Sequence, residues 1–351
     1  MLNLRIVRGP LPPEENEAIL LDYNRLTKAV IPMDEFVHWV QKGPPGPAWH
    51  AILETDEKRI VGHTSLIPLR TTCGRGELTP AKSEYSFVHE DFRSMPVRGF
   101  ESVKRAKFLI LVDQLFQHGK KLGWDPIFVS TREANYPLSR RVGCKAAEFP
   151  LWECMLIHKP VGAARHTPNL DGKQRAALLV AGVSQRVSWP ILSWGLAGSN
   201  GVHAEALYAE MNATNSGKLA FFEDQESLRW RYLEGQYVRF GFESSPEEYV
   251  IAKRGGEEKY VRVCQWQLSS PGLVDSALRA LVRCARDDKA IGVRWAVYDH
   301  EAMAPALVGR MRKLGFLCAR RNRTLMINTG QAAFYEASAW QVNDSLVSFD
   351  P

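Results

Sequence analysis

The sequence predicts an α/β protein made of two related halves, each with a mixed central sheet flanked by helices. Three observations lead to this fold class. Apolar residues switch between the spacing of strands and the spacing of helices along most of the chain. The same order of patterns starts again after His203. The length of 351 residues is enough for about two domains.

The first half begins with a strand that Gly9 and Pro10 end, followed by two helices with apolar residues at helical spacing. Two alternating runs then flank a polar turn, which predicts a hairpin. A later amphipathic helix ends at Gly123 and precedes a buried strand. The expected elements are strand 5–8, helices 13–28 and 33–41, strands 49–54, 59–69 and 83–89, helix 106–122, strand 125–130, helix 135–141 and strand 152–158.

The second half repeats this plan with a Trp-bearing segment, a hairpin, an amphipathic helix, a strand and a short helix that ends in basic residues and Gly. Its expected elements are helix 204–212, the segment 228–233, strands 248–253 and 259–268, helix 274–286, strand 292–298, helix 301–313 and strand 324–327. Residues 161–200 are rich in Gly, Ala, Ser and Pro, although they also contain apolar runs. We therefore expect domains at 1–160 and 201–351, joined by a connecting segment at 161–200.

The composition excludes several classes of protein. Hydrophobic residues make up 45% and charged residues 24%, which are ordinary globular values and exclude disordered, collagen-like and coiled-coil chains. Lys and Arg number 45 against 39 Asp and Glu, a net charge of +6. This mild excess suits an anionic ligand but is too small to indicate nucleic-acid binding.

The cysteines and the apolar runs bear on the compartment. The six cysteines have neither CxxC nor zinc-site spacing, so we expect free thiols in a reducing compartment and no metal site. No apolar run approaches the ~20 residues of a membrane-spanning helix, and the N-terminal residues lack a signal-peptide pattern. The sequence thus predicts a soluble cytoplasmic protein without a transmembrane segment, and it leaves a peripheral role at a membrane surface open.

Five short motifs carry a family resemblance through their order and spacing. They are Ile60-Val61-Gly62-His63 with Leu66, Pro68 and Leu69; Phe87-Val88-His89-Glu90-Asp91-Phe92-Arg93; Tyr136-Pro137 with Arg140-Arg141-Val142-Gly143-Cys144; Leu228-Arg229-Trp230-Arg231-Tyr232; and Lys313-Leu314-Gly315-Phe316. Together they resemble the GCN5-related N-acetyltransferase (GNAT) superfamily, and more narrowly its tandem-domain members found with bacterial polysaccharide genes. The resemblance covers most of the chain and implies two tandem acyl-CoA N-acyltransferase domains.

The resemblance also implies where acyl-CoA binds. In this fold the central strand diverges from its neighbour at a bulge, and the pantetheine arm pairs with the freed edge like an extra strand. Phe87, Val88 and His89 would offer that edge, with Asn135 near the start of the last helix.

The family's pyrophosphate loop carries repeated Gly, whereas the loop here has Gly99 alone. Side-chain charge would then replace backbone donors in holding the pyrophosphate. The candidates in and after this loop are Arg93, Arg98, Lys104 and Arg105.

Two residues are candidates for proton transfer. Glu84 lies four residues before Val88, so simple alternation places both on one face of the strand, where the carboxylate would be the general base. Glu84 as a surface residue at a strand end is the alternative. Tyr136 is the phenol near the last helix and would be the general acid.

The second half lacks the cofactor loop, which implies a degenerate domain that walls the acceptor cleft. Arg229, Trp230 and Tyr232 would contact the acceptor there, or would instead be plain core.

The resemblance predicts an N-acyltransferase that uses acetyl-CoA or another acyl-CoA, without a metal. It would transfer an acetyl group to an amino group of a sugar or polysaccharide precursor. The expected partner is a small-molecule or glycan amine, with no nucleic acid, and the protein is expected to be a monomer or homodimer. A catalytically degenerate GNAT-fold binding protein and a FemAB-like aminoacyl transferase remain as alternatives.

Overall fold

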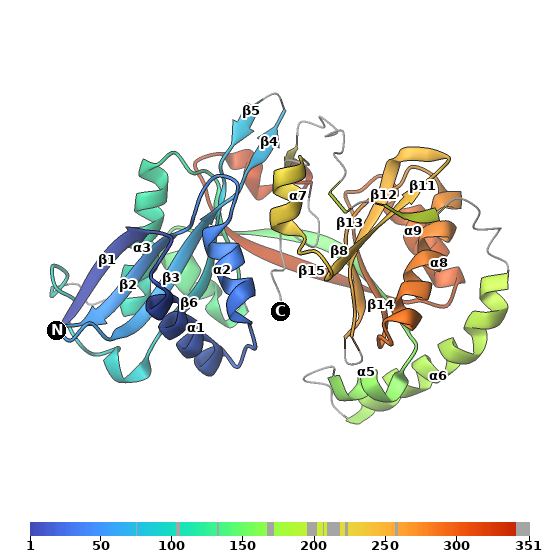
Figure 1. The fold of residues 1–351 in the computed structure, drawn as a ribbon, viewed down its shortest axis with the longest axis horizontal. Coiled ribbons are helices and arrows are strands. Elements are labelled where there is room, and N and C mark those ends of the chain that lie inside the picture. Colours follow the sequence, from blue (N-terminus) through green and yellow to red (C-terminus); the bar gives the residue numbers. More distant parts are fainter. Residues whose placement is uncertain are drawn as a thin grey trace.

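The structure is a computed structural model of an α/β protein, as predicted. It describes residues 1–341 except 75, 103–105, 132, 167–171, 195–201, 206, 209–217, 222–223 and 257–258, and of residues 166, 174, 186–194 and 203–205 it describes the backbone only. Figure 1 shows two lobes, which we call lobe 1 (N-terminal, blue to teal) and lobe 2 (yellow to orange). A twelve-stranded sheet runs through both lobes, in the order β1-β2-β3-β6-β7-β15-β8-β14-β13-β12-β11-β9.

Lobe 1 has helices on both faces of its part of the sheet. Its strands are β1 (Leu2–Arg8), β2 (Trp49–Thr55), β3 (Ile60–Pro68), β6 (Ala81–Val88) and β7 (Ile127–Ser130). The helices are α1 (Pro13–Thr27), α2 (Met33–Gln41), α3 (Lys107–Lys121) and α4 (Tyr136–Arg141). Ile19 of α1 and Phe36 of α2 pack with Phe87 in one apolar cluster, whereas Leu111 of α3 packs with Val88 in another. The α1/α2 face and the α3/α4 face of the sheet are therefore opposite.

Lobe 2 repeats the order of hairpin, helix, strand and helix. Its strands are β9 (Val202–Glu205), β11 (Tyr237–Phe242), β12 (Ser245–Lys253), β13 (Val261–Gln267) and β14 (Gly292–Tyr298), and its long helices are α8 (Pro271–Asp287) and α9 (Ala304–Lys313). Leu278 of α8 and Leu307 of α9 pack on Val263 and Trp295 of the sheet. The periodicity of these segments made them predictable, and all of them except β9 and β11 lie close to the expected ranges.

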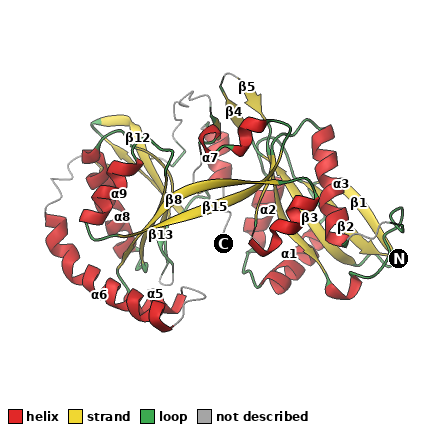
Figure 2. Cartoon of the chain, turned by 180° about the vertical axis from the view of Figure 1, so that it is seen from behind, coloured by secondary structure: helices red, strands yellow, loops and turns green. Residues whose placement is uncertain are grey.

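The two lobes exchange their last strands. β8 (Lys145–Ile157) follows lobe 1 in the chain but pairs with β14 of lobe 2. β15 (Leu317–Asn328) follows lobe 2 but pairs with β7 of lobe 1. The two long strands pair with each other from Leu317–Met155 to Ile327–Lys145, and Figure 2 shows them as a ribbon between the lobes. Because the sheet is continuous, the domain limits at 160 and 201 stay predictions.

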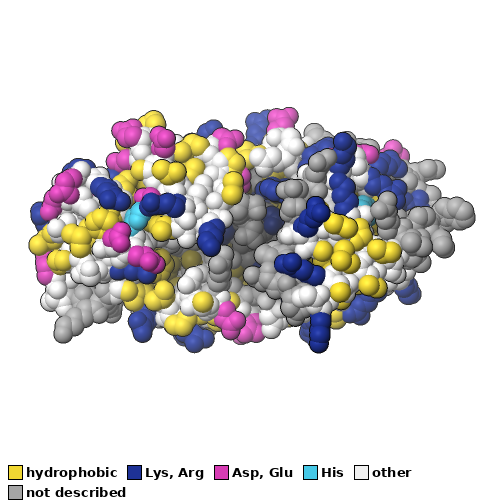
Figure 3. Space-filling model, turned by 90° about the horizontal axis from the view of Figure 1, so that it is seen from below, with side chains coloured by type: hydrophobic (Ala, Val, Ile, Leu, Met, Phe, Trp, Pro, Cys, Tyr) yellow, Lys and Arg dark blue, Asp and Glu magenta, His cyan; other side chains and the backbone are white. Residues whose placement is uncertain are grey.

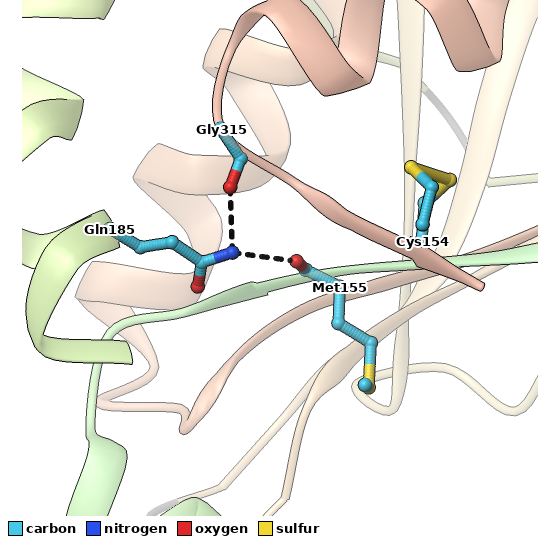
Figure 4. The surroundings of a disulfide bond; sticks show 5 residues. Cys154, Met155, Gln185 and Gly315 are labelled. Atoms are coloured by element: carbon cyan, nitrogen blue, oxygen red, sulfur yellow. Dashed lines mark hydrogen bonds between the residues drawn. A yellow bond between two sulfur atoms is a disulfide. The ribbon is translucent and has the colours of Figure 1, made fainter. Parts of the chain in front are cut away.

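A disulfide corrects the expectation that all cysteines are free. Cys154 of β8 and Cys318 of β15 lie opposite each other in the ribbon and are bonded (Figure 4). Cys73, Cys144, Cys264 and Cys284 form no disulfide with one another or with the bonded pair. Spacing along the chain could not reveal this pair, because 164 residues separate its members.

The predicted connecting segment contains two helices, α5 (Pro160–His166) and α6 (Gly172–Trp194). Gln185 of α6 fastens this segment to the ribbon, since its Nε2 donates to the carbonyls of Gly315 (2.7 Å) and Met155 (3.2 Å), as Figure 4 shows. Its Oε1 accepts from the amide of Ile157 at 2.8 Å. Within the described residues, no helix is long and apolar enough to span a bilayer.

Shorter elements join the lobes. β10 (Leu219–Phe221) pairs with β4 (Thr71–Cys73), which pairs with β5 (Gly76–Leu78), in a small sheet. In α7 (Gln225–Arg231), Trp230 packs edge-on against Trp39 of α2 with ring centroids 5.2 Å apart. The helix expected at 204–212 is wrong at its start, where the chain forms β9, and residues 206 and 209–212 lie outside the described residues.

Candidate functional site

The candidate site is an opening between two parallel strands of lobe 1. β6 and β7 pair only at Ala81–Ile127 and Lys82–Phe128. After these residues, β6 keeps its pairing with β3 and β7 keeps its pairing with β15. The C-terminal part of β6 therefore presents one edge that no described strand covers, and an extended ligand could pair with it.

A bulge in β6 lies beside the opening. In the register with β3, Phe87 pairs with His63 and Glu84 with Ser65, so Tyr85 and Ser86 both lie opposite Thr64. Tyr85 adopts the left-handed conformation, with φ of 53°. A bulge of this kind bends a strand and redirects its side chains.

The bulge overturns the expectation that Glu84 and Val88 share a face. Val88 packs in the cluster with α3, whereas Tyr85 and Phe87 pack in the cluster with α1 and α2. The side chain of Glu84 lies on the α1/α2 side with Lys82, its ion-pair partner. The alternation argument failed because one extra residue between Glu84 and Val88 shifts the pleat by one position.

Two buried histidines hold the bulge. Nδ1 of His63 donates to the carbonyl of Tyr85 at 2.8 Å, and Nε2 of His63 lies 3.0 Å from Nδ1 of His50. Burial lowers the pKa of His63 to about 4 and that of His50 well below its ordinary value. Both rings are therefore neutral, and Nδ1 of His50 is the donor to Nε2 of His63.

His63 makes the stability of the fold depend on pH. Because the pKa of His63 is about 4 in the folded protein and about 6.5 when unfolded, the unfolded chain binds more protons between these values. The contribution of neutral His63 to the free energy of unfolding is fully present above pH ~6.5 and is lost as the pH falls toward ~4. We expect a contribution of about 2 kcal/mol to be lost between pH ~7.5 and ~5. Urea unfolding of the protein and of His63→Gln at both pH values measures it, and equal pH dependence in the two would contradict the assignment.

Lys82 is a site residue that the sequence did not single out. Its side chain is 1% exposed and forms an ion pair with Glu84, whose side chain is 19% exposed. Lys82 stands at the last paired position before the strands diverge, so the carboxylate is held at the mouth of the opening. The sequence does carry a signal for this pair. Lys82 lies two residues before Glu84, and in a strand such residues lie on the same face.

His89 is buried just beyond β6 and binds α1. Its Nε2 lies 2.8 Å from a carboxylate oxygen of Asp22, and its amide donates to the carbonyl of Val61 at 2.9 Å. Arg25 approaches the same ring and pairs with Asp22 at 2.7 Å. The imidazole is thus occupied in joining α1 to the end of β6, while the strand edge that Phe87 and Val88 supply borders the opening.

The N-terminus of α3 lies at the Val88 end of β6. Leu111, one turn into the helix, packs near Val88 and Gly62, and no acidic residue occupies the first turn of α3. Lys107 opens the helix, and the free backbone N–H groups of a helix N-terminus favour an anion. Arg93 follows β6 closely and is exposed, with a loose 3.6 Å pair to Glu90.

Other predicted loop residues are not brought to this opening. The amide of Arg98 donates to the carbonyl of Leu2, and its guanidinium lies 3.5 Å from Asp56. Arg98 and Gly99 therefore lie beside β1, at the outer edge of the sheet and three strands from β6. The chain after Arg93 leads away from the opening. The prediction that Arg98 and Gly99 belong to the pyrophosphate loop is therefore wrong. Lys104 and Arg105 lie outside the described residues.

Tyr136 and Asn135 stand at the start of α4. Tyr136 is partly buried against the α3-side cluster that contains Val88. The side-chain Nδ2 of Asn135 donates to the Thr131 hydroxyl at 3.0 Å, which orients the turn between β7 and α4. Tyr136 and Glu84 therefore lie on opposite faces of the sheet.

Two parallel strands also diverge in lobe 2, but the space at the end of one of them is occupied by a side chain of the protein. β13 and β14 pair only from Val261–Val293 to Val263–Trp295, and β13 has its own irregularity opposite Ile251 and Ala252. At the end of β13, however, the buried carboxylate of Glu248 accepts from the amide of Ser269 at 2.9 Å and pairs with its hydroxyl. An internal carboxylate thus occupies the place before α8 where a phosphate would bind.

The predicted acceptor residues are mostly core. Trp230 is 3% exposed and its carbonyl accepts from Nε2 of His38, while Tyr232 is fully buried and donates to Gln265 at 2.7 Å. Arg229 is exposed and lies over the ring of Tyr208. The structure gives Trp230 and Tyr232 packing roles and leaves Arg229 on the surface.

Several solved structures share this fold at low sequence identity. A protein of unknown function from Enterococcus faecalis, called a probable N-acyltransferase, matches with TM-score 0.57 and 10% identity over 92% of this chain and 72% of its own. A GCN5-related N-acetyltransferase from Anabaena variabilis matches with TM-score 0.52 and 11% identity, over 92% and 72%. A proposed acetyltransferase from Pyrococcus horikoshii matches with TM-score 0.52 and 11% identity, over 97% and 92%.

No family model and no curated protein matches the sequence. The structural likeness nevertheless shows that this chain has the fold of the GCN5-related N-acetyltransferases, which confirms the predicted resemblance at the level of fold.

Proposed function

We propose that the protein is an acyl-CoA-dependent N-acyltransferase whose site is the opening in lobe 1. The observation that supports this most is the divergence of β6 from β7 after Lys82, next to the bulge at Tyr85. It leaves the edge of residues 83–88 for an extended pantetheine arm. The N-terminus of α3, free of acidic residues in its first turn, is placed for the pyrophosphate, and Arg93 adds a side-chain cation.

Lobe 1 suits the cofactor better than lobe 2 for an electrostatic reason. In lobe 2 the carboxylate of Glu248 binds Ser269 just before α8, and a second negative charge there would be repelled. At the start of α3 the first side chain is instead the cation Lys107. We therefore propose that lobe 2 shapes the acceptor cleft.

The residues on the two faces of the opening suit a direct transfer. Acyl-CoA supplies an activated acyl group when bound. Glu84 on the α1/α2 face would take the proton from the acceptor amine, and Lys82 holds its carboxylate in place. Tyr136 on the α3/α4 face would protonate the thiolate of the leaving CoA. The proposed acid and the proposed base thus lie on opposite faces of the sheet.

We propose an amino group of a sugar or polysaccharide precursor as the acceptor. The support is the resemblance of the motif order to tandem acyltransferases associated with polysaccharides. Figure 3 shows the face of the molecule that is hollowed between the two lobes, with Lys and Arg side chains beside the hollow.

Calorimetric titration with acetyl-CoA tests the proposed site. Arg93→Ala is expected to weaken binding by about threefold to tenfold, because it removes one cation from the pyrophosphate end. Arg98→Ala is the matched control, since it removes an exposed arginine from the same loop at a place three strands away, and we expect no change. Equal weakening by both variants, or no binding of acetyl-CoA by the unmodified protein, would contradict the proposal.

A further inference from the structure

A pocket lies beside the C-terminal ends of α3 and α4, away from the proposed acyl-CoA site at their N-terminal ends. It has a volume of about 680 Å³, within the range of small-molecule sites. Its walls come from the C-terminal half of α3, the end of α4, the start of β8, the end of β15 and the 3₁₀ turn η3 (Ala332–Tyr335). None of the residues assigned to the acyl-CoA site lines this pocket, so the two sites share no residue.

Three cations from three different elements line this pocket. They are Lys120 near the end of α3, Arg141 at the end of α4 and Lys145 at the start of β8. Among the described residues, none of the three forms an ion pair with a carboxylate. The Nζ atom of Lys145 lies 5.2 Å from the ring centroid of Tyr335, which anchors that side chain. Three cations against the one carboxylate that lines the pocket, Asp113, leave this concave site with a net positive charge, which favours a multiply charged anion.

The pocket also offers acceptors for hydroxyl groups. Asp113 lines it, and its Oδ2 accepts from Nε2 of Gln117 at 3.1 Å. Asn328, only 6% exposed, donates its Nδ2 to the carbonyl of Val142 at 2.8 Å, which leaves its Oδ1 as an acceptor. This carboxylate and this amide oxygen would not bind phosphate, but they suit the hydroxyls of a sugar.

The backbone makes this wall of the pocket rigid. Gly143 has φ of 82°, and a Cβ there would lie 3.0 Å from Nδ2 of Asn328. A side chain at position 143 would therefore be strained and would displace the amide of Asn328. The hydroxyl of Tyr335 donates to the carbonyl of Thr329 at 3.1 Å and fixes the opposite wall.

We propose that this pocket binds a phosphorylated sugar. Lys120, Arg141 and Lys145 bind the phosphate, and Asp113 and Asn328 accept hydrogen bonds from the sugar hydroxyls. The proposal rests on the geometry of this pocket and does not depend on acyl-CoA binding at the opening between β6 and β7.

Calorimetric titration with ribose 5-phosphate tests the proposal, with ribose and inorganic phosphate as comparison ligands. We expect ribose 5-phosphate to bind more tightly than inorganic phosphate, and ribose to show no binding. Arg141→Gln and Lys145→Gln are each expected to weaken binding of ribose 5-phosphate about tenfold, because each removes a charged hydrogen bond to the phosphate. Arg140→Gln changes the preceding arginine, which does not line the pocket, and should leave the affinity unchanged.

The outcomes separate this proposal from the proposed function. No binding of ribose 5-phosphate, equal affinity for inorganic phosphate, or unchanged affinity in Arg141→Gln and Lys145→Gln would overturn it. Thermal melts of these surface variants check that they fold. Arg93→Ala should leave ribose 5-phosphate affinity unchanged, and Arg141→Gln should leave acetyl-CoA affinity unchanged. Failure at one site is thus visible independently of the other.

Discussion

Replacing Glu84 with Gln is expected to lower the rate constant of acyl transfer by about 100-fold or more, while leaving acetyl-CoA affinity within about twofold. The amide keeps the size of the side chain but cannot accept the proton of the acceptor amine. The measurement is release of CoA thiol from acetyl-CoA with D-glucosamine as the acceptor, as a function of pH. The variant should stay slow at every pH tested.

Glu90→Gln is the matched control for this prediction. Glu90 follows β6 by two residues, is exposed, and makes only a loose pair with Arg93. We expect its rate to equal that of the unmodified protein. Full activity in Glu84→Gln, with the same pH profile, would remove Glu84 from the chemistry and leave the Lys82–Glu84 pair a structural role.

Removing the disulfide is expected to have the largest effect on stability. Cys154 and Cys318 close a loop that spans a sequence separation of 164 residues, and they join the two strands that the lobes exchange. By the loop-entropy relation, Cys154→Ala with Cys318→Ala should lower the free energy of unfolding by about 5 kcal/mol. Urea unfolding of the oxidised protein and of the double variant measures the difference.

Thiol titration accompanies this measurement. The oxidised protein should show four reactive thiols after unfolding without reductant, out of six cysteines. Cys284→Ala is the control, since Cys284 lies on α8, away from the ribbon, and is free. Six titratable thiols, or equal stability of the oxidised protein and the double variant, would show that pairing alone holds the exchanged strands.

Local patterns predicted the elements that carry clear periodicity. The hairpin of β2 and β3, the helices α3 and α8 and the strand β14 fall close to their expected ranges because one buried face marks each of them. The sequence predicts a connecting segment where α6 lies, because the Gly, Ala and Ser content of α6 resembles that of linkers. The strand exchange had no local signal, since the pairing of β8 with β15 joins residues far apart in the chain.

The site was predictable in place but not in detail. The motif around Phe87 and Val88 located the strand that borders the opening. The bulge at Tyr85 was invisible to a rule of strict alternation, so the face of Glu84 was wrong. Lys82 lies just outside the predicted strand 83–89, and lysine is normally exposed, whereas this side chain is buried and paired with Glu84.

Hydrogen exchange in the presence of acetyl-CoA tests the central claim most directly. The account predicts slower exchange of the amides at 84–88 in β6 and at 107–108 in α3, because the pantetheine arm pairs with the first and the pyrophosphate binds the second. The amides at 264–269, at the corresponding place in lobe 2, should be unchanged. Protection confined to 264–269, or no protection in either lobe at saturating acetyl-CoA, would contradict the assignment of the acyl-CoA site to lobe 1.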